Sequence, residues 1–280
     1  MIQWLIFTGM MQNSKRSWTS YQGVANVTNL YNRMMRFVSM TNTSVTDALM
    51  ICVWTCCGRM VILMAVEMIV LNNREEWLQH RTGRIGGSDA SAIVGMNPYR
   101  TNVELWQIKT GQLVPEDISE KPFVKYGTEA EQHLRELFKL DFPEYQVFYT
   151  ENNMWLNDKY PWAHYSADGW LRDQDGRLGI WECKTTNILQ SMQKEKWKGR
   201  IPDNYYIQLL HGFLVMEADF AVLVAQLKSE FNGEIYKQTK HYKIERSEVA
   251  ADIKYLENSE KEFWKMVQER KRPGLILPAV

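Results

Sequence analysis

The segment over residues 164–185 carries acidic and basic side chains whose spacing could bind a metal ion. Turn-forming residues lie in its middle, over residues 173–176, so the segment is predicted to form a β-hairpin. If the turn is centred on Asp175, Asp168 lies directly opposite Glu182, and facing residues of a hairpin have Cβ atoms about 4.5–5.5 Å apart. Two carboxylates at that distance repel each other unless a cation lies between them. Hard oxygen ligands of this kind suit Mg²⁺ or Mn²⁺.

The register of the hairpin decides whether the two carboxylates can share a cation. Asp168 and Glu182 lie an even number of positions apart, so they face the same side only if the connection contains an odd number of residues. We therefore predict a loop of three or five residues centred on Asp175, or a bulge that restores the same parity. Lys184 lies two positions after Glu182 and projects on the same side, where its ammonium could orient an attacking water and offset charge that develops on a phosphate.

The alternative interpretation is a solvated hairpin with ordinary surface charges, because an Asp, a Glu and a Lys at such spacings often arise by chance. The apolar residues Ile180, Trp181 and Cys183 alternate with or flank the charged positions and indicate a strand of the core. Unpaired acidic and basic side chains would be costly on such a strand. We therefore favour a functional cluster of charges.

A second carboxylate could join this cluster. Residues 127–138 are predicted to form an amphipathic helix, and Glu131 lies on its buried stripe while Glu129 faces solvent. An inward-facing Glu either pairs with a base or belongs to a metal site. The apolar face of the same helix is expected to contain Ala130, Leu134, Leu137 and Phe138.

Two further groups could bind phosphate or water. Tyr205 and Gln208 lie one turn apart on a predicted helix, although a polar pair at a helix interface would look the same. Upstream, Gly86-Gly87 lets the backbone approach a ligand closely, and Ser88 opens a predicted helix whose N-terminal amides favour anions. With Arg81 this segment could form a phosphate pocket. The alternative is a capped helix after a flexible turn, with Arg81 paired to a nearby acid such as Glu76.

The elements that must position these residues begin near residue 74. Helices are predicted over residues 75–81, 88–94, 102–110, 127–138, 204–216 and 247–271. Strands are predicted over residues 145–150, 163–172, 178–185, 220–227 and 236–244. Helices followed by strands with interleaved helices predict a mixed domain of the α/β (α+β) class.

Composition changes sharply near residue 72. Ten of the fifteen methionines but only two acidic residues precede it. We therefore expect an unmatched apolar, Met-rich extension over residues 1–70 and a folded domain over residues 71–280. Residues 48–71 are long enough to span a bilayer, but Arg59 and Glu67 inside this run argue against a membrane anchor. We favour upstream sequence included through a misplaced start codon, with Met68 as the natural beginning, over an anchor or a poorly ordered extension.

The overall charge and the cysteines limit the function. The formal net charge is zero, so any contact with nucleic acid must come from a local patch or from metal ions that neutralise phosphate. The four cysteines form no C-x-x-C pair, which disfavours a zinc site and a disulfide framework and indicates reduced thiols in the cytoplasm. No iron–sulfur cluster is expected, because only Cys183 lies near the motifs above and four thiolates are required.

Five motifs of the sequence resemble those of the YqaJ-like viral recombinases, the lambda exonuclease family within the PD-(D/E)xK nucleases. They occur in the family's order between residues 74 and 271: Arg81 with Gly87-Ser88-Asp89, Gly127 with Glu131, Ser166-Ala167-Asp168-Gly169, Glu182-Cys183-Lys184, and Tyr205 with Gln208. The resemblance implies a restriction-endonuclease-like mixed β-sheet flanked by helices, and it makes residues 71–280 a nuclease domain.

The implied activity is a Mg²⁺-dependent 5′→3′ exonuclease that degrades duplex DNA from its ends by two-metal phosphodiester hydrolysis, with Mn²⁺ able to substitute. Such enzymes act in phage-type homologous recombination, as ring-shaped homotrimers beside a single-strand annealing protein, in the cytoplasm of a bacterial host. A related endonuclease or repair nuclease of different polarity is the first alternative. A DNA-end-binding protein with a dead active site is the second, and the intact acidic pair and lysine argue against it.

The resemblance also implies a role for each site residue. Asp168, Glu182, the Cys183 carbonyl and Glu131 would bind metal, Gln208 would complete the site, and Lys184 would position the water. The DNA-binding residues would be Tyr205 and, around a 5′-phosphate, Arg81, Ser88 and Ser166.

Overall fold

The structure is a computed structural model that describes residues 52–54, 60–62, 66–189 and 191–277. Residues 1–51 of the expected extension lie outside this part of the chain. Within the apolar run over residues 48–71, the described segments are strands: β1 (Cys52–Trp54) pairs with β2 (Met60–Ile62), and β3 (Val66–Val70) follows. Among the residues that the structure describes, no helix combines the length and apolar character needed to cross a membrane.

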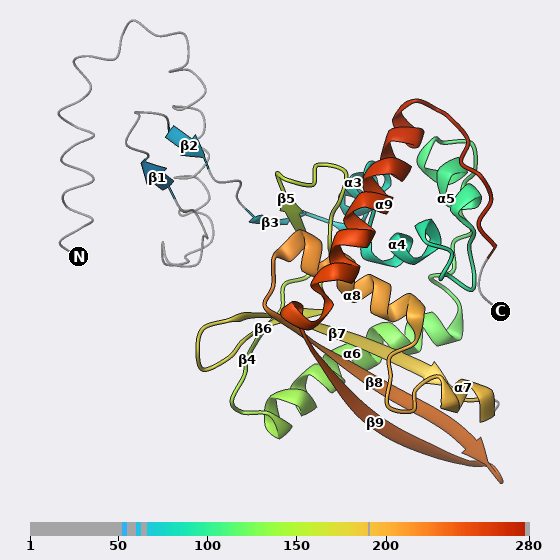
Figure 1. Cartoon of the computed structure of the whole chain (residues 1–280). Coiled ribbons are helices and arrows are strands. Elements are labelled where there is room, and N and C mark those ends of the chain that lie inside the picture. Colours follow the sequence, from blue (N-terminus) through green and yellow to red (C-terminus); the bar gives the residue numbers. More distant parts are fainter. Residues whose placement is uncertain (1–51, 55–59, 63–65, 190, 278–280) are drawn as a thin grey trace, which may run out of the picture. The chain divides into compact units, whose positions relative to one another are not determined.

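A five-stranded sheet forms the centre of the described domain (Figure 1). Its strands follow one another in the spatial order β4 (Gln146–Phe148), β6 (Gly169–Arg172), β7 (Leu178–Asn187), β8 (Phe220–Phe231) and β9 (Glu234–Glu245). The central strands β7 and β8 are parallel, and every other neighbouring pair is antiparallel. The predicted fold class, a mixed β-sheet flanked by helices, is confirmed.

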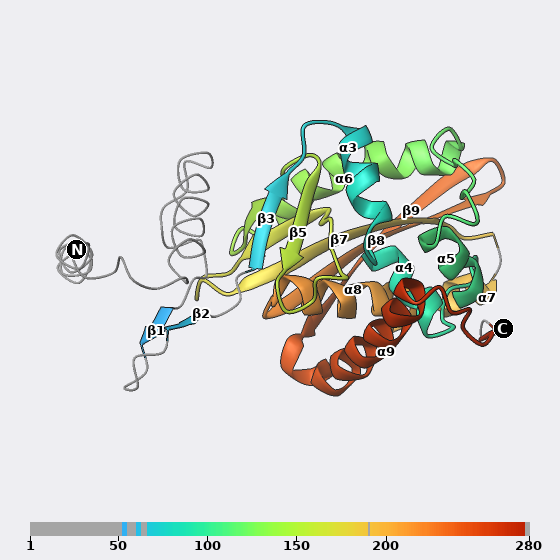
Figure 2. The same cartoon turned by 90° about the horizontal axis from the view of Figure 1, so that it is seen from above.

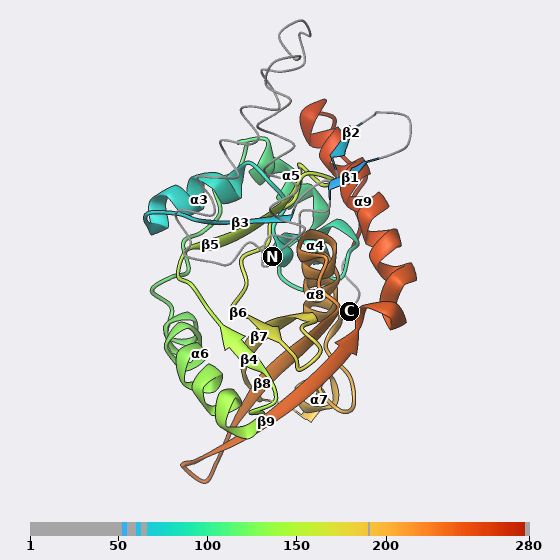
Figure 3. The ribbon, with the colours of Figure 1, turned by 90° about the vertical axis from the view of Figure 1, so that its left-hand side faces the viewer.

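The two faces of the sheet are covered by different helices, as Figure 3 shows. Helix α6 (Pro122–Asp141) packs on one face through Leu134 and Phe138, against Trp181 and Phe220. Helix α8 (Asp203–Met216) packs on the other face, against Ile180 and alternate residues of β8. Successive side chains of a strand point to opposite faces, so Ile180 and Glu182 of β7 face α8 while Trp181 and Cys183 face α6. The charged positions of β7 therefore lie on the α8 side.

Five further helices complete the described domain. These are α3 (Arg74–Thr82), α4 (Gly87–Ile93), α5 (Asn102–Lys109), the short α7 (Ser191–Glu195) and α9 (Ala250–Gln268), which follows a 3₁₀ turn over Arg246–Val249. Thr101 caps α5: its side chain accepts a hydrogen bond from the amide of Glu104, and the Glu104 carboxylate accepts from the Thr101 amide. Helices α4, α8 and α9 pack together and form a support behind the sheet.

A two-stranded ribbon was not predicted. Strand β3 pairs antiparallel with β5 (Asn153–Asn157), and Figure 2 shows the two side by side. Behind them Leu71, Trp77 and Met154 form a small core. Strand β3 lies just before the expected domain boundary at residue 71 and belongs to the described fold. The short strands escaped prediction because their pairing partners are more than eighty residues apart in the chain.

Two expected elements, the helix over residues 127–138 and the strand over residues 163–172, differ from the structure in length or exposure. Helix α6 starts at Pro122 rather than residue 127, because proline is well suited to the first helical turn. Leu137 was expected on its buried face but is 53% exposed, so the apolar stripe is narrower than predicted. The expected strand over residues 163–172 contains only β6 at its end. Its first half instead crosses between the two sheets, with isolated bridges from Ala163 to Ile85 and from Tyr165 to Trp155.

Candidate active site

The β6–β7 hairpin brings the two predicted carboxylates together. Gly169 pairs with Trp181 and Arg172 with Leu178, so a five-residue loop over residues 173–177 is centred on Asp175. Continuing this register by one residue places Asp168 opposite Glu182. The predicted odd-numbered loop is therefore confirmed, and both carboxylates are presented to the same side of the sheet.

Glu182 is the most enclosed member of the site, with 1% of its surface exposed. Its Oε1 accepts hydrogen bonds from Lys184 Nζ at 2.5 Å and from Gln208 Nε2 at 2.6 Å. Its Oε2 accepts a hydrogen bond from the hydroxyl of Tyr165. Three of the residues that the sequence singled out thus meet at one carboxylate, and Tyr165 joins them as a residue that the sequence did not reveal.

Asp168 has a less complete set of partners. Its Oδ2 accepts one hydrogen bond, from the backbone amide of Cys183 at 2.9 Å. Burial and the negative charge of Glu182 hold the pKa of Asp168 well above its ordinary value, and the ammonium of Lys184 only partly opposes them. For Lys184, burial alone would lower the pKa, but the charges of Glu182 and Asp168 raise it, so this lysine is an ammonium at neutral pH.

Asn153 fixes the backbone in front of Asp168. Its side-chain amide donates to the carbonyl of Ala167 at 2.9 Å and accepts from the Ala167 amide at 2.9 Å. Asn153 is buried on β5, so the unpredicted ribbon has a direct part in the site. These two hydrogen bonds with the Asn153 side chain fix the backbone of Ala167 and thereby limit the movement of Asp168, the next residue.

Glu131 contacts the site through an arginine. Its Oε1 accepts from Arg135 Nη1 at 2.9 Å, and the same nitrogen donates to the backbone carbonyl of Asp168 at 2.6 Å. Burial raises the pKa of Glu131, while the hydrogen bond and charge of Arg135 act against the increase. The guanidinium of Arg135 also lies 3.8 Å from the ring centre of Tyr149. Glu131 therefore lies at the rim of the acidic pair, held by a base one turn away on α6.

The residues present fit a hard divalent cation. Within the described ranges, no three His, Cys, Asp or Glu side chains gather closely enough to hold a metal ion by themselves. The available donors are the carboxylates of Asp168 and Glu182 and the carbonyl of Cys183. All of these are oxygens, and Mg²⁺ is usually bound by one or two carboxylates together with waters and substrate phosphates. The thiol of Cys183 faces the α6 core, where burial raises its pKa and keeps it protonated.

Tyr205 lies beside the lysine of the site. Lys184 Nζ is 5.4 Å from the centre of the Tyr205 ring, and this ring is stacked on Trp197 at a centroid distance of 5.6 Å. An aromatic face next to the ammonium could accept a base or a sugar of a bound nucleic acid.

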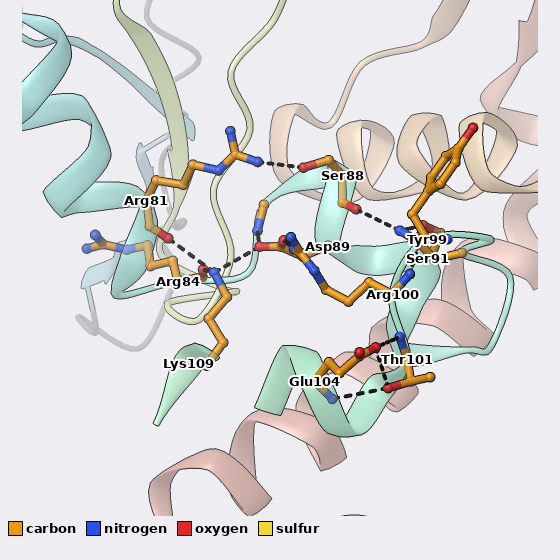
Figure 4. Close-up of polar contacts among 12 residues, drawn as sticks. Arg81, Arg84, Ser88, Asp89, Ser91, Tyr99, Arg100, Thr101, Glu104 and Lys109 are labelled. Atoms are coloured by element: carbon orange, nitrogen blue, oxygen red, sulfur yellow. Dashed lines mark hydrogen bonds and ion pairs between the residues drawn. The ribbon is translucent and has the colours of Figure 1, made fainter. Parts of the chain in front are cut away.

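The predicted phosphate residues also converge, as Figure 4 shows for two of them. Arg81 Nη2 donates to Ser88 Oγ at 2.6 Å. The guanidinium lies 5.0 Å from the ring centre of Trp77, and Trp77 Nε1 donates to Ser166 Oγ at 2.9 Å. The carboxylate of Glu76, the acid considered as an alternative partner of Arg81, instead accepts from the backbone and side-chain amides of Asn72, and the Glu76 amide donates to the side chain of Asn73. Arg81 and Ser166 thus contact the same indole, and Ser88 joins them through its hydrogen bond with Arg81.

Asp89 and Lys109 hold this group in place (Figure 4). Lys109 Nζ lies 2.8 Å from the Asp89 carboxylate and donates to the carbonyl oxygens of Arg84 at 2.6 Å and Arg81 at 3.3 Å. The end of α3, the turn after it and the start of α4 are thereby tied to α5.

Several residues of the site were not identified from the sequence: Tyr165, Arg135, Asn153, Trp77 and Lys109. Only Arg135 carried a usable signal, because it lies four positions after Glu131 on the same helix. The others act through contacts between segments that are distant in the chain.

The site has the arrangement of the D…ExK type, with an Asp before one strand and a Glu and a Lys two positions apart on the next. The YqaJ-like viral recombinase domain family matches residues 76–219, more than half of the chain. This range contains every residue assigned to the site above. This chain belongs to that family.

Individual relatives are more distant. The chain is 30% identical over 198 residues to the uncharacterized protein YqaJ of Bacillus subtilis (strain 168), a match that covers 69% of this chain. It spans 56% of that relative's length. Among solved structures, an alkaline exonuclease from Laribacter hongkongensis is similar with a TM-score of 0.48 and 17% identity, over 71% of this chain and 96% of that one. A phage related exonuclease from Haemophilus somnus 129PT gives a TM-score of 0.41 and 13% identity, over 67% and 96%.

Proposed function

We propose that this chain is a deoxyribonuclease that hydrolyses duplex DNA from its ends and depends on a divalent cation. The observation that carries the proposal is the pair of carboxylates, Asp168 and Glu182, facing one another on a core hairpin with Lys184 2.5 Å from Glu182. Membership of the YqaJ-like viral recombinase family supports it. An acidic pair with one buried member and a single ammonium has no evident structural use on this face of the sheet, which otherwise packs through apolar residues.

Each residue then has a chemical role. Asp168, Glu182 and the Cys183 carbonyl would hold the cation, which when bound polarises the phosphodiester and makes a water more acidic. Lys184 would orient the attacking water and stabilise negative charge on the phosphate oxygens. Gln208 and Tyr165 orient Glu182 from opposite sides. Glu131, held by Arg135, lies at the rim where it could accept a proton or contact a second cation.

The group around Trp77 would bind the end of the DNA. Arg81 supplies a fixed positive charge, and Ser88 and Ser166 supply hydroxyls around the same indole. Ser166 lies two residues before Asp168, so a terminal 5′-phosphate held here would have its next phosphodiester close to the acidic pair. This proximity favours removal of nucleotides from the 5′ end.

Family membership extends the proposal. We infer that Mg²⁺ is the preferred ion, with Mn²⁺ as a substitute, and that two ions act together. We also infer a ring-shaped homotrimer and a single-strand annealing partner in phage-type recombination in a bacterial cytoplasm. A related endonuclease of the same chemistry is the alternative that the experiment must separate.

The test is an assay on matched DNA substrates. Linear duplex labelled at the 5′ or the 3′ end, and covalently closed circular duplex, are incubated with the full-length chain in EDTA, Mg²⁺, Mn²⁺ or Ca²⁺. The proposal predicts early loss of the 5′ label, with Mg²⁺ or Mn²⁺ only, and intact circular DNA. Cleavage of the circle would favour the endonuclease. Cleavage in EDTA, or none with any cation, would overturn the proposal.

A narrower prediction concerns Arg81. Charge-assisted hydrogen bonds from a guanidinium to phosphate are stronger than neutral ones, so duplex with a 5′-phosphate should be degraded faster than duplex with a 5′-hydroxyl. Arg81→Ala should narrow that difference, while Arg272→Ala, a change near the C-terminal end of the described chain, should leave it unchanged. Equal rates on the two substrates with the unaltered chain would contradict this role.

A further inference from the structure

Tyr165 contacts the site from the hydrophobic core and is almost completely enclosed, with 1% of its surface exposed. Its hydroxyl donates to Glu182 Oε2, the oxygen that neither Lys184 nor Gln208 contacts. This hydrogen bond joins Tyr165 directly to one carboxylate of the acidic pair.

The two helices around the ring lack side chains where it lies. A Cβ atom added at Gly87 of α4 would be 2.9 Å from Cε2 of Tyr165, and one added at Gly212 of α8 would be 3.0 Å from its Cζ. The first distance is shorter than Cβ atoms adopt and the second is tighter than an ordinary contact, so an alanine at either position would press against the ring. The slot between α4 and α8 is shaped to the tyrosine.

The backbone of Tyr165 is fixed as well. Its amide and carbonyl exchange hydrogen bonds with Trp155 of β5 at 3.0 Å and 2.7 Å. The carbonyl of the preceding residue, His164, accepts from Nε2 of His211 at 2.8 Å, and Nδ1 of His211 is 2.6 Å from the buried carboxylate of Glu260 on α9. Close packing around the ring and hydrogen bonds to the backbone thus fix the position of the Tyr165 hydroxyl.

We propose that Tyr165 is a positioning residue that holds Glu182 in the orientation needed to bind the divalent cation; this rests on the proposed function. Lys184 also orients Glu182, but its positive charge would repel a cation at the same carboxylate. The phenol is a neutral donor that can remain in place whether or not a cation is bound. Partners of metal-binding carboxylates typically change metal affinity or activity by about 10- to 100-fold when they are removed.

The test removes one oxygen atom. Tyr165→Phe retains the ring that fills the slot and deletes the hydroxyl. Mn²⁺ binding to the full-length variant, measured by titration calorimetry, should be at least about 10-fold weaker than in the unaltered chain. Cleavage of linear duplex should need correspondingly more Mn²⁺ and recover at high Mn²⁺. Tyr206→Phe is the matched control. It also deletes a phenol that donates to a carboxylate, because the hydroxyl of Tyr206 on α8 lies 2.6 Å from Asp252 on α9, outside the site. It should bind Mn²⁺ normally.

A second measurement keeps the ring and the hydroxyl and does not require the Phe variant to fold. With 3-fluorotyrosine at position 165, the ¹⁹F resonance should shift when Mg²⁺ is added, and with 3-fluorotyrosine at position 206 it should not. Unchanged Mn²⁺ affinity in Tyr165→Phe, or a ¹⁹F signal at position 165 that ignores Mg²⁺, would overturn the inference while the unaltered chain still bound cation and cut DNA. An unaltered chain that did neither would instead overturn the proposed function.

Discussion

Two aspartates in this domain, Asp89 and Asp168, have opposite environments. Asp89, 3% exposed at the start of α4, is surrounded by positive charge and donors. Lys109 lies at 2.8 Å, Arg100 at 3.5 Å, and the amide of Gly86 donates to it at 3.2 Å. Burial alone would raise its pKa, but these partners lower the pKa of Asp89 to about 2. Its charge is fully satisfied within the protein.

Asp168 has the opposite environment. Burial and the facing carboxylate of Glu182 raise the pKa of Asp168 well above its ordinary value, and its one backbone hydrogen bond, from Cys183, only partly opposes this. Two acids share a single nearby ammonium, that of Lys184. The comparison teaches that the fold can provide bases for a buried acid where the acid serves stability. At the hairpin the fold provides one ammonium for two acids, and a bound cation would balance the remaining negative charge.

The largest expected effect comes from Asp168→Asn. The amide has nearly the same shape but no charge, so DNA cleavage should be abolished, while the free energy of unfolding should stay the same or increase because repulsion with Glu182 is relieved. Cleavage and urea denaturation of the same preparation would check both statements. Near-normal Mg²⁺-dependent turnover in Asp168→Asn would show that the charge of Asp168 is not needed for cleavage, and would contradict the contrast drawn with Asp89.

Lys184→Met should have the next largest effect. Loss of a group that stabilises charge in the transition state should lower kcat by about 100- to 1,000-fold. Mn²⁺ affinity should not fall, because the ammonium repels the cation rather than binding it. Lys254→Met, which removes an exposed lysine on α9, serves as the control and should leave kcat unaltered. A Lys184→Met variant with normal kcat and weakened Mn²⁺ binding would reverse the assigned role.

Asp89→Asn should affect stability rather than chemistry. The pKa of Asp89 falls from an ordinary 3.8 to about 2, which corresponds to about 2 kcal/mol of stability at pH 7. Because the folded-state pKa is the lower one, this contribution is present above pH 4 and is lost as the pH falls toward 2. Urea denaturation of both chains at several pH values should show a gap that closes over that interval. A gap that stayed constant with pH would mean that the carboxylate charge is not its origin.

The smallest effect is expected from removing the N-terminal extension. A chain that begins at Met68 should remain active, because the site residues all follow it. It lacks the first two pairs of the β3–β5 ribbon, Val66 with Asn157 and Glu67 with Leu156, and should lose about 1 kcal/mol or less relative to a chain that begins at Val66. Failure of the Met68 chain to fold, while the full-length chain folds, would show that the apolar run supports the domain.

What the sequence could predict depends on how local the signal is. The register of Asp168 and Glu182 followed from a turn and from strand alternation, both of which are set within twenty residues. Glu129 is exposed and Glu131 half-buried, as the helical period predicts. The same period wrongly predicted a buried Leu137, which is exposed because the edge of the helix's apolar stripe faces solvent.

The missing pieces are those that depend on distant contacts. Strand β3 is five residues long and pairs with β5, about ninety residues later, so no local period announces it. Tyr165 looks like any core aromatic until Gly87 and Gly212 are brought around it. Asn153 gains its role only when β5 lies beside the loop that precedes Asp168.

The central claim, that the acidic pair with its single ammonium is a divalent-cation site, is tested most directly by titrating Mn²⁺ into three folded chains: unaltered, Asp168→Asn and Asp89→Asn. We expect saturable binding in the unaltered chain, the same affinity in Asp89→Asn below its unfolding temperature, and no measurable binding in Asp168→Asn. Equal Mn²⁺ binding in all three chains, or binding lost in Asp89→Asn and retained in Asp168→Asn, would contradict the account.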